Sequence, residues 1–231
     1  MLNFDRYHVL TFDCYGTLID WESGILKAVR PVLETHGAGV DDQAILEMYA
    51  QMEAALEADE YMRYQLLVEE AMAGMGGSFG IDLADDERRA VVSSIKDWRP
   101  FPDTVAALKR LKKKYKLAII SNIDDHLFAA SAVHLDVAFD WVVTAEQSGA
   151  YKPSPRMFEF ALERIGQPKE AILHVAQSRY HDIAPARKLG LQTVWVNRRT
   201  GEKGPGATPP SDATPDLEVA SLAELADAAG L

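Results

Sequence analysis

Five short apolar runs rich in β-branched residues recur along the sequence, and helical patterns separate the last four of them. They read HVLTF (8–12), KLAIIS (116–121), DWVVT (140–144), AILHVA (171–176) and QTVWV (192–196). Continuous apolar strands that alternate with helices are typical of a parallel sheet covered on both faces. We therefore expect an α/β fold built on a doubly wound parallel sheet.

The alternation stops after the first run. Residues 42–75 are rich in Glu, Ala and Leu at helical spacing, residues 85–98 form a second helical stretch, and neither contains a convincing strand. We predict an α/β core of residues 1–20 and 99–231, with an all-helical cap, 21–98, inserted after the first strand. An insertion at this point would lie over the carboxyl ends of the strands, where open α/β sheets bind ligands.

The end of the chain holds two further segments. Residues 198–216 are rich in Gly, Pro and Thr, which is typical of a loop. Residues 217–231 read LEVASLAELADAAGL, and we predict a final helix there.

Composition excludes several classes of partner. The net charge is −11 and the pI is about 5, whereas nucleic-acid binding needs clustered Lys and Arg. The dense basic run, residues 109–116, lies on a predicted amphipathic helix and is interpreted as a solvated face. No apolar run approaches the roughly 20 residues of a membrane span, and the N-terminus lacks the pattern of a signal peptide. A single cysteine, Cys14, suits a reducing compartment, so we expect a cytoplasmic protein without nucleic-acid or membrane partners.

Polar side chains follow the first four predicted strands, at the edge where the carboxyl ends of parallel strands meet. In chain order they are Asp13, Tyr15 and Thr17, then Ser121 and Asn122, then Lys152, then Asp182. Each is weak evidence alone, because a strand-end Asp is often a turn former and a lone Lys is usually at the surface. Their occurrence in order on four strand ends favours an active site.

The residue types favour nucleophilic catalysis by a carboxylate. A carboxylate in a dry site needs a nearby ammonium to keep it ionised, and Lys152 can supply that charge to Asp13. Thr17 and Ser121 can donate hydrogen bonds to Asp13. Asp182 can hold Lys152, or a water molecule that hydrolyses the ester.

The motifs DCYGTL, SN and KP, followed by Asp182, resemble those of the haloacid dehalogenase superfamily, and DxYGTL is similar to the L-2-haloacid dehalogenase branch. The resemblance implies a Rossmann-like core with a helical cap. It also implies that Asp13 attacks C2 of a small 2-substituted carboxylic acid, and that water then hydrolyses the aspartyl ester. Ser121, Asn122 and backbone N–H groups beside Tyr15 would bind the substrate carboxylate.

The same resemblance bears on cofactors. Phosphatases of the superfamily carry Asp where this chain has Tyr15, and Gly-Asp where it has Ala176 and Gln177. Because both carboxylates that serve Mg²⁺ and the leaving alkoxide are replaced, we expect a metal-independent hydrolase without a cofactor. Halide, unlike alkoxide, leaves without a proton. A Mg²⁺-dependent phosphatase and a non-catalytic binding domain remain the alternatives.

The last motif departs from the dehalogenase pattern. The chain reads QSRYHD at 177–182, which more closely resembles the (S)-azetidine-2-carboxylate hydrolase type, an enzyme that opens a strained ring. A ring amine needs a proton to leave, and His181 can donate one; alternatively, His181 is an exposed residue at a helix start. Gln177 and His181 therefore join the substrate-binding candidates.

Two further family positions differ in this chain. A family tyrosine is replaced by Phe158, and Gln51 stands where the cap arginine would align, with Arg63 as its stand-in among the substrate-binding candidates. The sequence leaves open both the leaving group and whether the chain forms a homodimer.

Overall fold

The structure, a computed structural model, describes residues 2–231 and contains a six-stranded parallel sheet of order β3-β2-β1-β4-β5-β6. The strands are β1 Val9–Phe12, β2 Lys116–Ser121, β3 Trp141–Thr144, β4 Ile172–Ala176, β5 Gln192–Val196 and β6 Leu217–Val219. The first five coincide with the apolar runs to within one residue at each end. The expected parallel α/β sheet is therefore confirmed.

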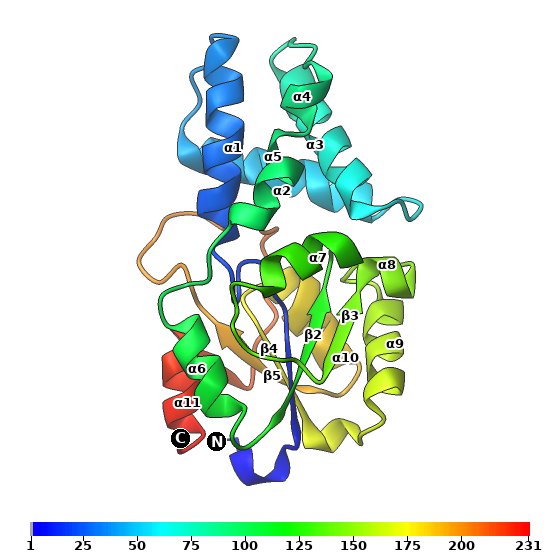
Figure 1. Cartoon of the computed structure of the whole chain (residues 1–231), viewed down its shortest axis with the longest axis vertical. Helices are drawn as coiled ribbons and strands as arrows, with labels where there is room; N and C mark the ends of the chain where they lie inside the picture. The colour runs from blue at the N-terminus through cyan, green and yellow to red at the C-terminus, as the bar shows by residue number, and fades with distance from the viewer. Residues whose placement is uncertain (1) are drawn as a thin grey trace.

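Helices lie on both faces of the sheet and above the carboxyl ends of its strands (Figure 1). Beside the sheet are α6 Thr104–Leu111, α7 Asp125–Ala132, α8 Ala145–Ser148, α9 Pro155–Ile165, α10 Ala184–Lys188 and α11 Leu222–Ala228. Above it are α1 Trp21–Thr35, α2 Asp42–Glu57, α3 Tyr64–Ser78, α4 Asp85–Arg88 and α5 Ala90–Ser94. Single turns occur at Phe4–Arg6, Ile95–Asp97 and Lys169–Ala171, and a π-helical turn spans Arg179–Ile183.

Alternating side chains of the strands form two apolar layers, because successive residues of a strand point to opposite faces. Val9 packs with Met157 and Phe158 of α9, whereas Leu10 and Phe12 belong to the cluster that contains α6 and α11. Both faces of the sheet are therefore covered, as a doubly wound fold requires.

The C-terminal segment corrects one prediction. Residues 217–231 were expected to be helical throughout, but Leu217–Val219 forms the edge strand β6 alongside Val194–Val196. Pairing with the edge of β5 outweighs helix propensity there. The helix begins only after Ser221, whose hydroxyl accepts from the backbone N–H of Glu224 at 3.1 Å.

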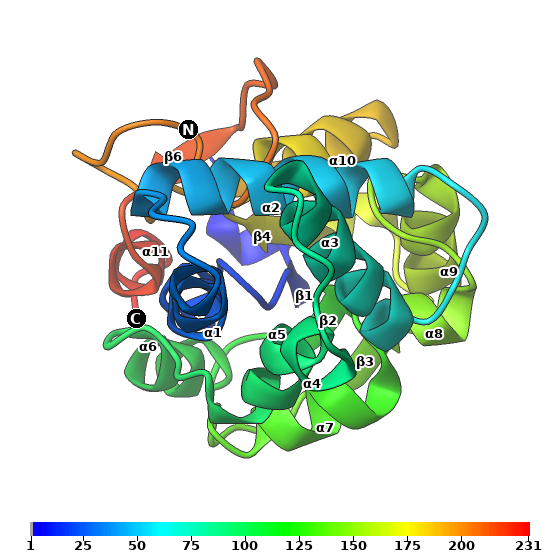
Figure 2. The ribbon, with the colours of Figure 1, turned by 90° about the horizontal axis from the view of Figure 1, so that it is seen from above.

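The chain enters and leaves the helical insertion, residues 21–98, through two adjacent linkers. Ile19 bridges Pro100, and the backbone N–H of Asp20 donates to the carbonyl of Arg99 at 2.9 Å. The helices between these linkers stand over the carboxyl ends of the strands (Figures 1 and 2). We propose that they form a cap on a core of residues 1–20 and 99–231.

Neither predicted helical stretch of the insertion is continuous. Residues 58–63 separate α2 from α3, and the stretch at 85–98 divides into α4, α5 and a single turn. The start of α3 depends on a tertiary contact, since Asp124 from the loop after β2 accepts from the N–H groups of Tyr64 and Gln65 at 2.9 and 3.0 Å. This carboxylate caps the helix and ties the insertion to the sheet edge.

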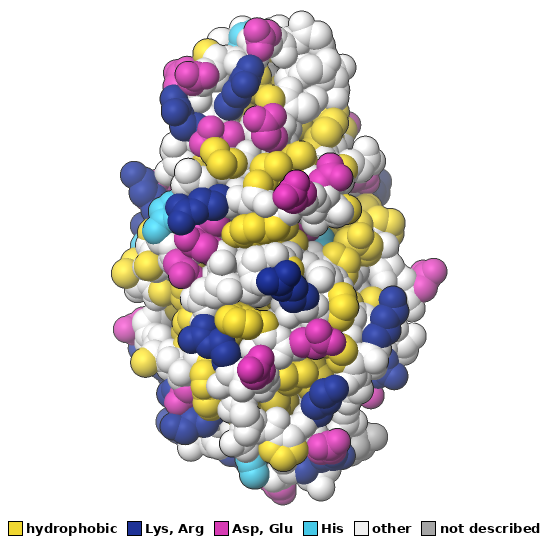
Figure 3. Space-filling view, turned by 90° about the vertical axis from the view of Figure 1, so that its right-hand side faces the viewer, with side chains coloured by type: hydrophobic (Ala, Val, Ile, Leu, Met, Phe, Trp, Pro, Cys, Tyr) yellow, Lys and Arg dark blue, Asp and Glu magenta, His cyan; other side chains and the backbone are white. Residues whose placement is uncertain are grey.

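The surface that carries α8 and α9 mixes charge types. Basic, acidic and hydrophobic side chains are interspersed across this face (Figure 3). Within residues 2–231, no helix combines the length and the apolar composition that crossing a bilayer would require.

Trp98 packs between the insertion and the loop after β1. A Cβ atom on Gly24 of α1 would lie 2.4 Å from Trp98 Nε1, so only glycine allows this approach. The other side of the contact is the ring of Tyr15, which meets Trp98 edge to face at 5.8 Å between centroids. The position of α1 is thereby linked to that of the Tyr15 loop.

Gly24→Ala is expected to lower the free energy of unfolding by about 1–3 kcal/mol, because the added methyl group overlaps the Trp98 indole. Urea denaturation measures the change. The matched control is Gly77→Ala in α3, where a Cβ atom meets nothing within 4 Å and a gain of about 0.5–1 kcal/mol is expected. Equal effects of the two substitutions would contradict the packing argument.

Candidate active site

The side chains of Asp13, Lys152 and Asp182 meet at the carboxyl edge of the sheet. Lys152 Nζ lies 2.8 Å from Asp13 Oδ1 and 2.8 Å from Asp182 Oδ1, and donates to the carbonyl oxygen of Ile120 at 3.0 Å. Asp13 follows β1, Lys152 lies in the loop after α8, and Asp182 lies in the π-helical turn after β4. Lys152 is only 1% exposed, so the ammonium is surrounded by its three acceptors.

Thr17 fixes the second oxygen of Asp13. Its hydroxyl donates to Asp13 Oδ2 at 2.7 Å and accepts from the backbone N–H of Gln177 at 2.8 Å. The turn that brings Thr17 back toward Asp13 passes through Gly16 at φ +89°, a conformation that favours glycine. Both carboxylate oxygens of Asp13 are therefore held.

Burial and charge act in opposite directions on this group of residues. Burial raises the pKa of Asp13, and the Lys152 ammonium and the Thr17 hydroxyl offset only part of that rise. Burial also disfavours the charge on Asp182, but the Lys152 ammonium and His174 outweigh it, so the pKa of Asp182 is lowered. For Lys152, the two carboxylates overcome the effect of burial and raise its pKa. The site thus favours a protonated Lys152.

His174, which the sequence analysis did not single out, contacts Asp182 from within the sheet. Its Nε2 lies 2.9 Å from Asp182 Oδ1, and its Nδ1 lies 2.8 Å from the hydroxyl of Thr11. His174 is fully buried in the middle of β4. The one available signal was a polar residue inside the apolar run AILHVA.

A small pocket of about 40 Å³ opens beside Asp13. Its lining includes these residues: Asp13, Tyr15, Trp21, Glu53, Glu57, Tyr64, Ser121, Asn122, Lys152, Gln177, Ser178, His181, Asp182 and Thr208. The structure therefore gathers the predicted residues Tyr15, Ser121, Asn122, Gln177 and His181 around Asp13.

Asn122 and Tyr15 make contacts that their predicted roles did not include. Asn122 Oδ1 accepts from the backbone N–H of Lys152 at 2.8 Å, and its Nδ2 donates to Glu57 Oε1 at 2.7 Å. The hydroxyl of Tyr15 donates to Ser131 Oγ at 2.8 Å. Asn122 therefore connects the Lys152 loop with the helical insertion.

His181 is buried, at 7% exposure, so the alternative of an exposed helix-start residue is wrong. Its backbone N–H donates to Ser178 Oγ at 2.8 Å, and its Nε2 lies 3.1 Å from Glu57 Oε2. Burial lowers the pKa of His181, but the carboxylates of Glu57 and Glu53 overcome this and raise it. The imidazole therefore lies in the pocket with its proton favoured.

Arg63, Gln51 and Phe158, the positions compared with the family's cap arginine and its tyrosine, do not line this pocket. The side chain of Arg63 is 55% exposed and pairs with Glu146 at 2.6 Å, outside the pocket lining. Gln51 is exposed, and Phe158 is fully buried in the core beside His174. The structure does not bring Arg63 to the site, because its Glu146 partner lies on α8.

The insertion instead contributes Glu53, Glu57 and Tyr64 to the pocket, none of which the sequence analysis named. Glu53 Oε1 accepts from the hydroxyls of Tyr49 and Tyr64 at 3.1 and 2.7 Å. Burial, followed by repulsion from Glu57, raises the pKa of Glu53 to about 8. The available signal was an acid on the buried stripe of α2, four residues after Tyr49.

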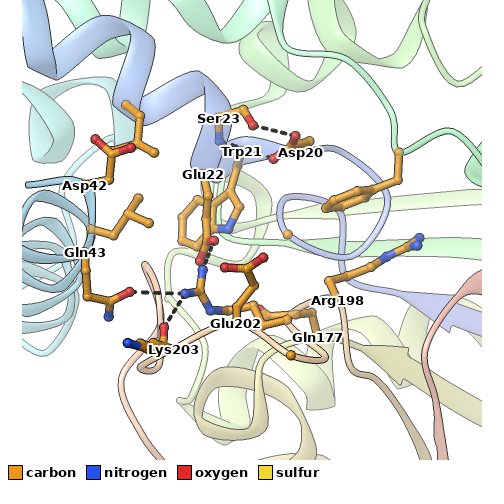
Figure 4. Close-up of a pocket in the computed structure, with 16 residues that line it drawn as sticks. Asp20, Trp21, Glu22, Ser23, Asp42, Gln43, Gln177, Arg198, Glu202 and Lys203 are labelled. Carbon is orange, nitrogen blue, oxygen red and sulfur yellow. Dashed lines mark hydrogen bonds and ion pairs between the residues drawn. The ribbon is translucent and has the colours of Figure 1, made fainter.

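A larger cavity of about 620 Å³ adjoins this pocket, and Trp21 and Gln177 line both. Figure 4 shows Glu22 and Gln43 of the insertion facing the loop that carries Lys203. Across this cavity Arg199 forms an ion pair with Glu22. The larger cavity is thus bounded by the insertion on one side and the 198–203 loop on the other.

Comparison with known proteins supplies three similarities. Residues 7–190 match the model of a family described as haloacid dehalogenase-like hydrolase. The (S)-2-haloacid dehalogenase of Pseudomonas fluorescens is 30% identical over 223 residues, covering 94% of this chain and 93% of that protein. A solved structure described as a dehalogenase with intermediate complex has a TM-score of 0.80 and 25% identity, and covers 96% of each chain.

Lys152→Met is expected to lower the free energy of unfolding by about 3–5 kcal/mol, because two buried carboxylates lose their counter-charge. Without the ammonium, burial and mutual repulsion leave both carboxylates with raised pKa values. A carboxyl group with a raised folded-state pKa costs stability as the pH rises. The loss in free energy of unfolding caused by Lys152→Met should therefore grow between about pH 5 and pH 8. Urea midpoints at both pH values measure it.

The matched control for this substitution is Lys27→Met, since Lys27 is exposed on α1. A deficit for Lys152→Met that equals the control, or that shrinks with rising pH, would contradict the buried ion-pair argument.

Proposed function

This chain belongs to the haloacid dehalogenase-like hydrolase family, and on that premise we propose that Asp13 is its nucleophile and attacks C2 of a small 2-substituted carboxylic acid. The observation that carries the proposal is the Asp13 carboxylate at the end of β1, held by Lys152 and Thr17 beside a buried pocket. Such fixed hydrogen bonds keep the carboxylate aimed, and a dry pocket removes the water that would weaken it as a nucleophile. Relatives named (S)-2-haloacid dehalogenases support hydrolytic dehalogenation as the reaction class.

In the first step, an oxygen of Asp13 forms a bond to C2 while the bond from C2 to the leaving group breaks. The electron pair departs with halide, or stays on the protonated nitrogen of a strained ring, which becomes a neutral amine as the bond breaks. The product of this step is an ester between Asp13 and the substrate carbon. Ser121, Asn122 and the Tyr15 loop lie beside Asp13 and are the proposed contacts for the substrate carboxylate.

In the second step, water adds to the carboxyl carbon of Asp13. Asp182 Oδ2 is buried and has no hydrogen-bond partner within residues 2–231, so it is available to take one proton from that water. The same proton passes to the departing alkoxide and makes the product hydroxyl. The remaining proton leaves Asp13 as its carboxylate is regenerated, and it accompanies the halide or converts the released amine to an ammonium.

The alternative function is that of a Mg²⁺-dependent phosphatase, and the donor set fits that cation poorly. Asp13 Oδ1 and Asp182 Oδ1 already share the Lys152 ammonium. Tyr15 and Gln177 supply no carboxylate, whereas Mg²⁺ prefers several oxygen ligands that include carboxylates. The proposed reaction therefore uses this chain's own residues.

Asp13→Asn is expected to abolish turnover, because an amide cannot form the ester. A panel of 2-chloropropionate, fluoroacetate, azetidine-2-carboxylate and p-nitrophenyl phosphate, each with and without EDTA, measures the activity. Asp59→Asn is the control, since Asp59 is exposed beyond α2. Phosphate release that EDTA abolishes would favour the phosphatase, and wild-type turnover by intact Asp13→Asn would reject the nucleophile.

A single turnover in H₂¹⁸O, with enzyme in excess, is expected to leave ¹⁸O in the peptide that contains Asp13 and unlabelled oxygen in the product hydroxyl. The reason is that the product takes its oxygen from Asp13, and hydrolysis restores that oxygen from solvent. Mass spectrometry of the peptide and product measures both. Label in the product on the first turnover, with none in the peptide, would reassign Asp13 as a base.

A further inference from the structure

His174 is a buried imidazole in the middle of β4, and neither step of the proposed reaction uses it. It is fully buried, as is Thr11 of β1 beside it. The two residues are register partners in adjacent strands, so their side chains point to the same face of the sheet. Nδ1 of His174 lies 2.8 Å from the Thr11 hydroxyl, and Nε2 lies 2.9 Å from Asp182 Oδ1. The imidazole therefore joins β1 to Asp182, the proposed base of the second step.

These two contacts assign the proton of the imidazole to Nε2. Although burial opposes the charge on Asp182, Lys152 and His174 lower the pKa of this carboxyl group. An ionised carboxylate only accepts hydrogen bonds, so Nε2 carries the donated hydrogen, and Nδ1 accepts from the hydroxyl of Thr11. His174 thus acts on Asp182 as a hydrogen-bond donor.

The two oxygens of Asp182 make unequal contacts. Oδ1 accepts from Lys152 Nζ and from His174 Nε2, at 2.8 and 2.9 Å. Oδ2 is buried and has no hydrogen-bond partner within residues 2–231. Because the Lys152 ammonium is shared with Asp13 and the carbonyl of Ile120, His174 is the donor that serves Asp182 alone among the three carboxylate and carbonyl acceptors. Two donors on Oδ1 hold that oxygen and leave Oδ2 for a water molecule.

The ring of His174 is itself held in place. Phe158 of α9 meets it edge to face, with 5.1 Å between the ring centroids. The Thr11 hydroxyl holds the opposite nitrogen from the one that reaches Asp182. A donor that is locked by packing and by a second hydrogen bond keeps a catalytic group in a fixed orientation.

We propose that His174 is a positioning residue for hydrolysis of the aspartyl ester, and that it acts through Asp182. The inference rests on the proposed function in that it takes Asp182 as the base of the second step. In that step the proton of water passes to Asp182 Oδ2 and then to the departing alkoxide, while His174 keeps its own proton. The first step uses Asp13 as the nucleophile and needs no base, so loss of His174 should slow the second step selectively.

Single-turnover kinetics of His174→Leu, with enzyme in excess and acid quenching, separate the two steps. The probes are (S)-2-chloropropionate and (S)-azetidine-2-carboxylate. Loss of substrate measures the first step, and mass spectrometry of the Asp13 peptide follows formation and decay of the ester. We expect substrate loss within about threefold of the wild-type rate and ester hydrolysis about 10- to 100-fold slower, so that the ester accumulates.

Two further variants grade the effect. His174→Gln should restore part of the hydrolysis rate, because its amide can donate to Asp182 and accept from Thr11. Thr11→Val removes the partner of Nδ1 and should slow the same step by a smaller factor. His8→Leu is the matched control, since His8 is exposed and precedes β1 at the opposite end of the sheet. Circular dichroism checks that each variant is folded.

Long-range ¹H–¹⁵N NMR of the histidine rings reads the contact without turnover, and loss of a signal in His174→Gln assigns it. We expect a protonated Nε2 and an unprotonated Nδ1. A proton on Nδ1 alone would overturn the inference, because Asp182 would then lack its donor.

The kinetic outcomes distinguish this inference from the proposed function. Equal slowing of both steps in folded His174→Leu, or ester hydrolysis at the wild-type rate, would overturn the role of His174 while ester formation and the isotope pattern stay intact. If His174→Leu does not fold, the same criteria apply to Thr11→Val. An ester that forms in no variant and from neither probe would reject Asp13 as the nucleophile, and the positioning role of His174 with it.

Discussion

The Lys152 ammonium shared by Asp13 and Asp182 is the interaction on which the site depends. Two buried carboxylates this close would repel one another, and the charge between them makes their burial tolerable. The third contact of Lys152, to the carbonyl of Ile120, ties the ammonium to β2. The ends of β1, β2 and β4 are thus joined through a single side chain, and His174 braces Asp182 from within the sheet. Asp13, the proposed nucleophile, is therefore held by contacts to three strands of the sheet.

A second set of contacts joins the carboxyl ends of these strands to the helices above them. Asp124 caps the start of α3, and Asn122 pairs with Glu57, so the loop after β2 holds the insertion at two points. The core residues that line the pocket include Asp13, Lys152 and Asp182, as the family resemblance led us to expect. The insertion contributes Glu53 and Glu57 to the pocket, where that resemblance implied an arginine. The pocket therefore combines core residues expected from the family with residues of the insertion that the resemblance did not imply.

Much of the fold could be predicted from local pattern. The strands β1 to β5 are continuous apolar runs, and a strand buried on both faces needs such a run. The edge strand β6 could not be predicted, since LEV is short and helix-compatible and forms a strand only by pairing with β5. The start of α3 likewise depends on Asp124, which lies about sixty positions away. Arg63 illustrates the same limit, because its partner Glu146 lies 83 positions away in the sequence.

The sequence by itself determined that Asp13, Lys152 and Asp182 share one edge of the sheet, because parallel topology sends the residues after each strand to the same end. Only the tertiary structure decided that His174 contacts Asp182 and that Glu57 lines the same pocket as Asp13. A histidine within an apolar strand and an acid on a helical stripe each have many packing solutions. Periodicity defines which face of an element is buried, whereas the partner of that face is set by how the insertion docks on the sheet.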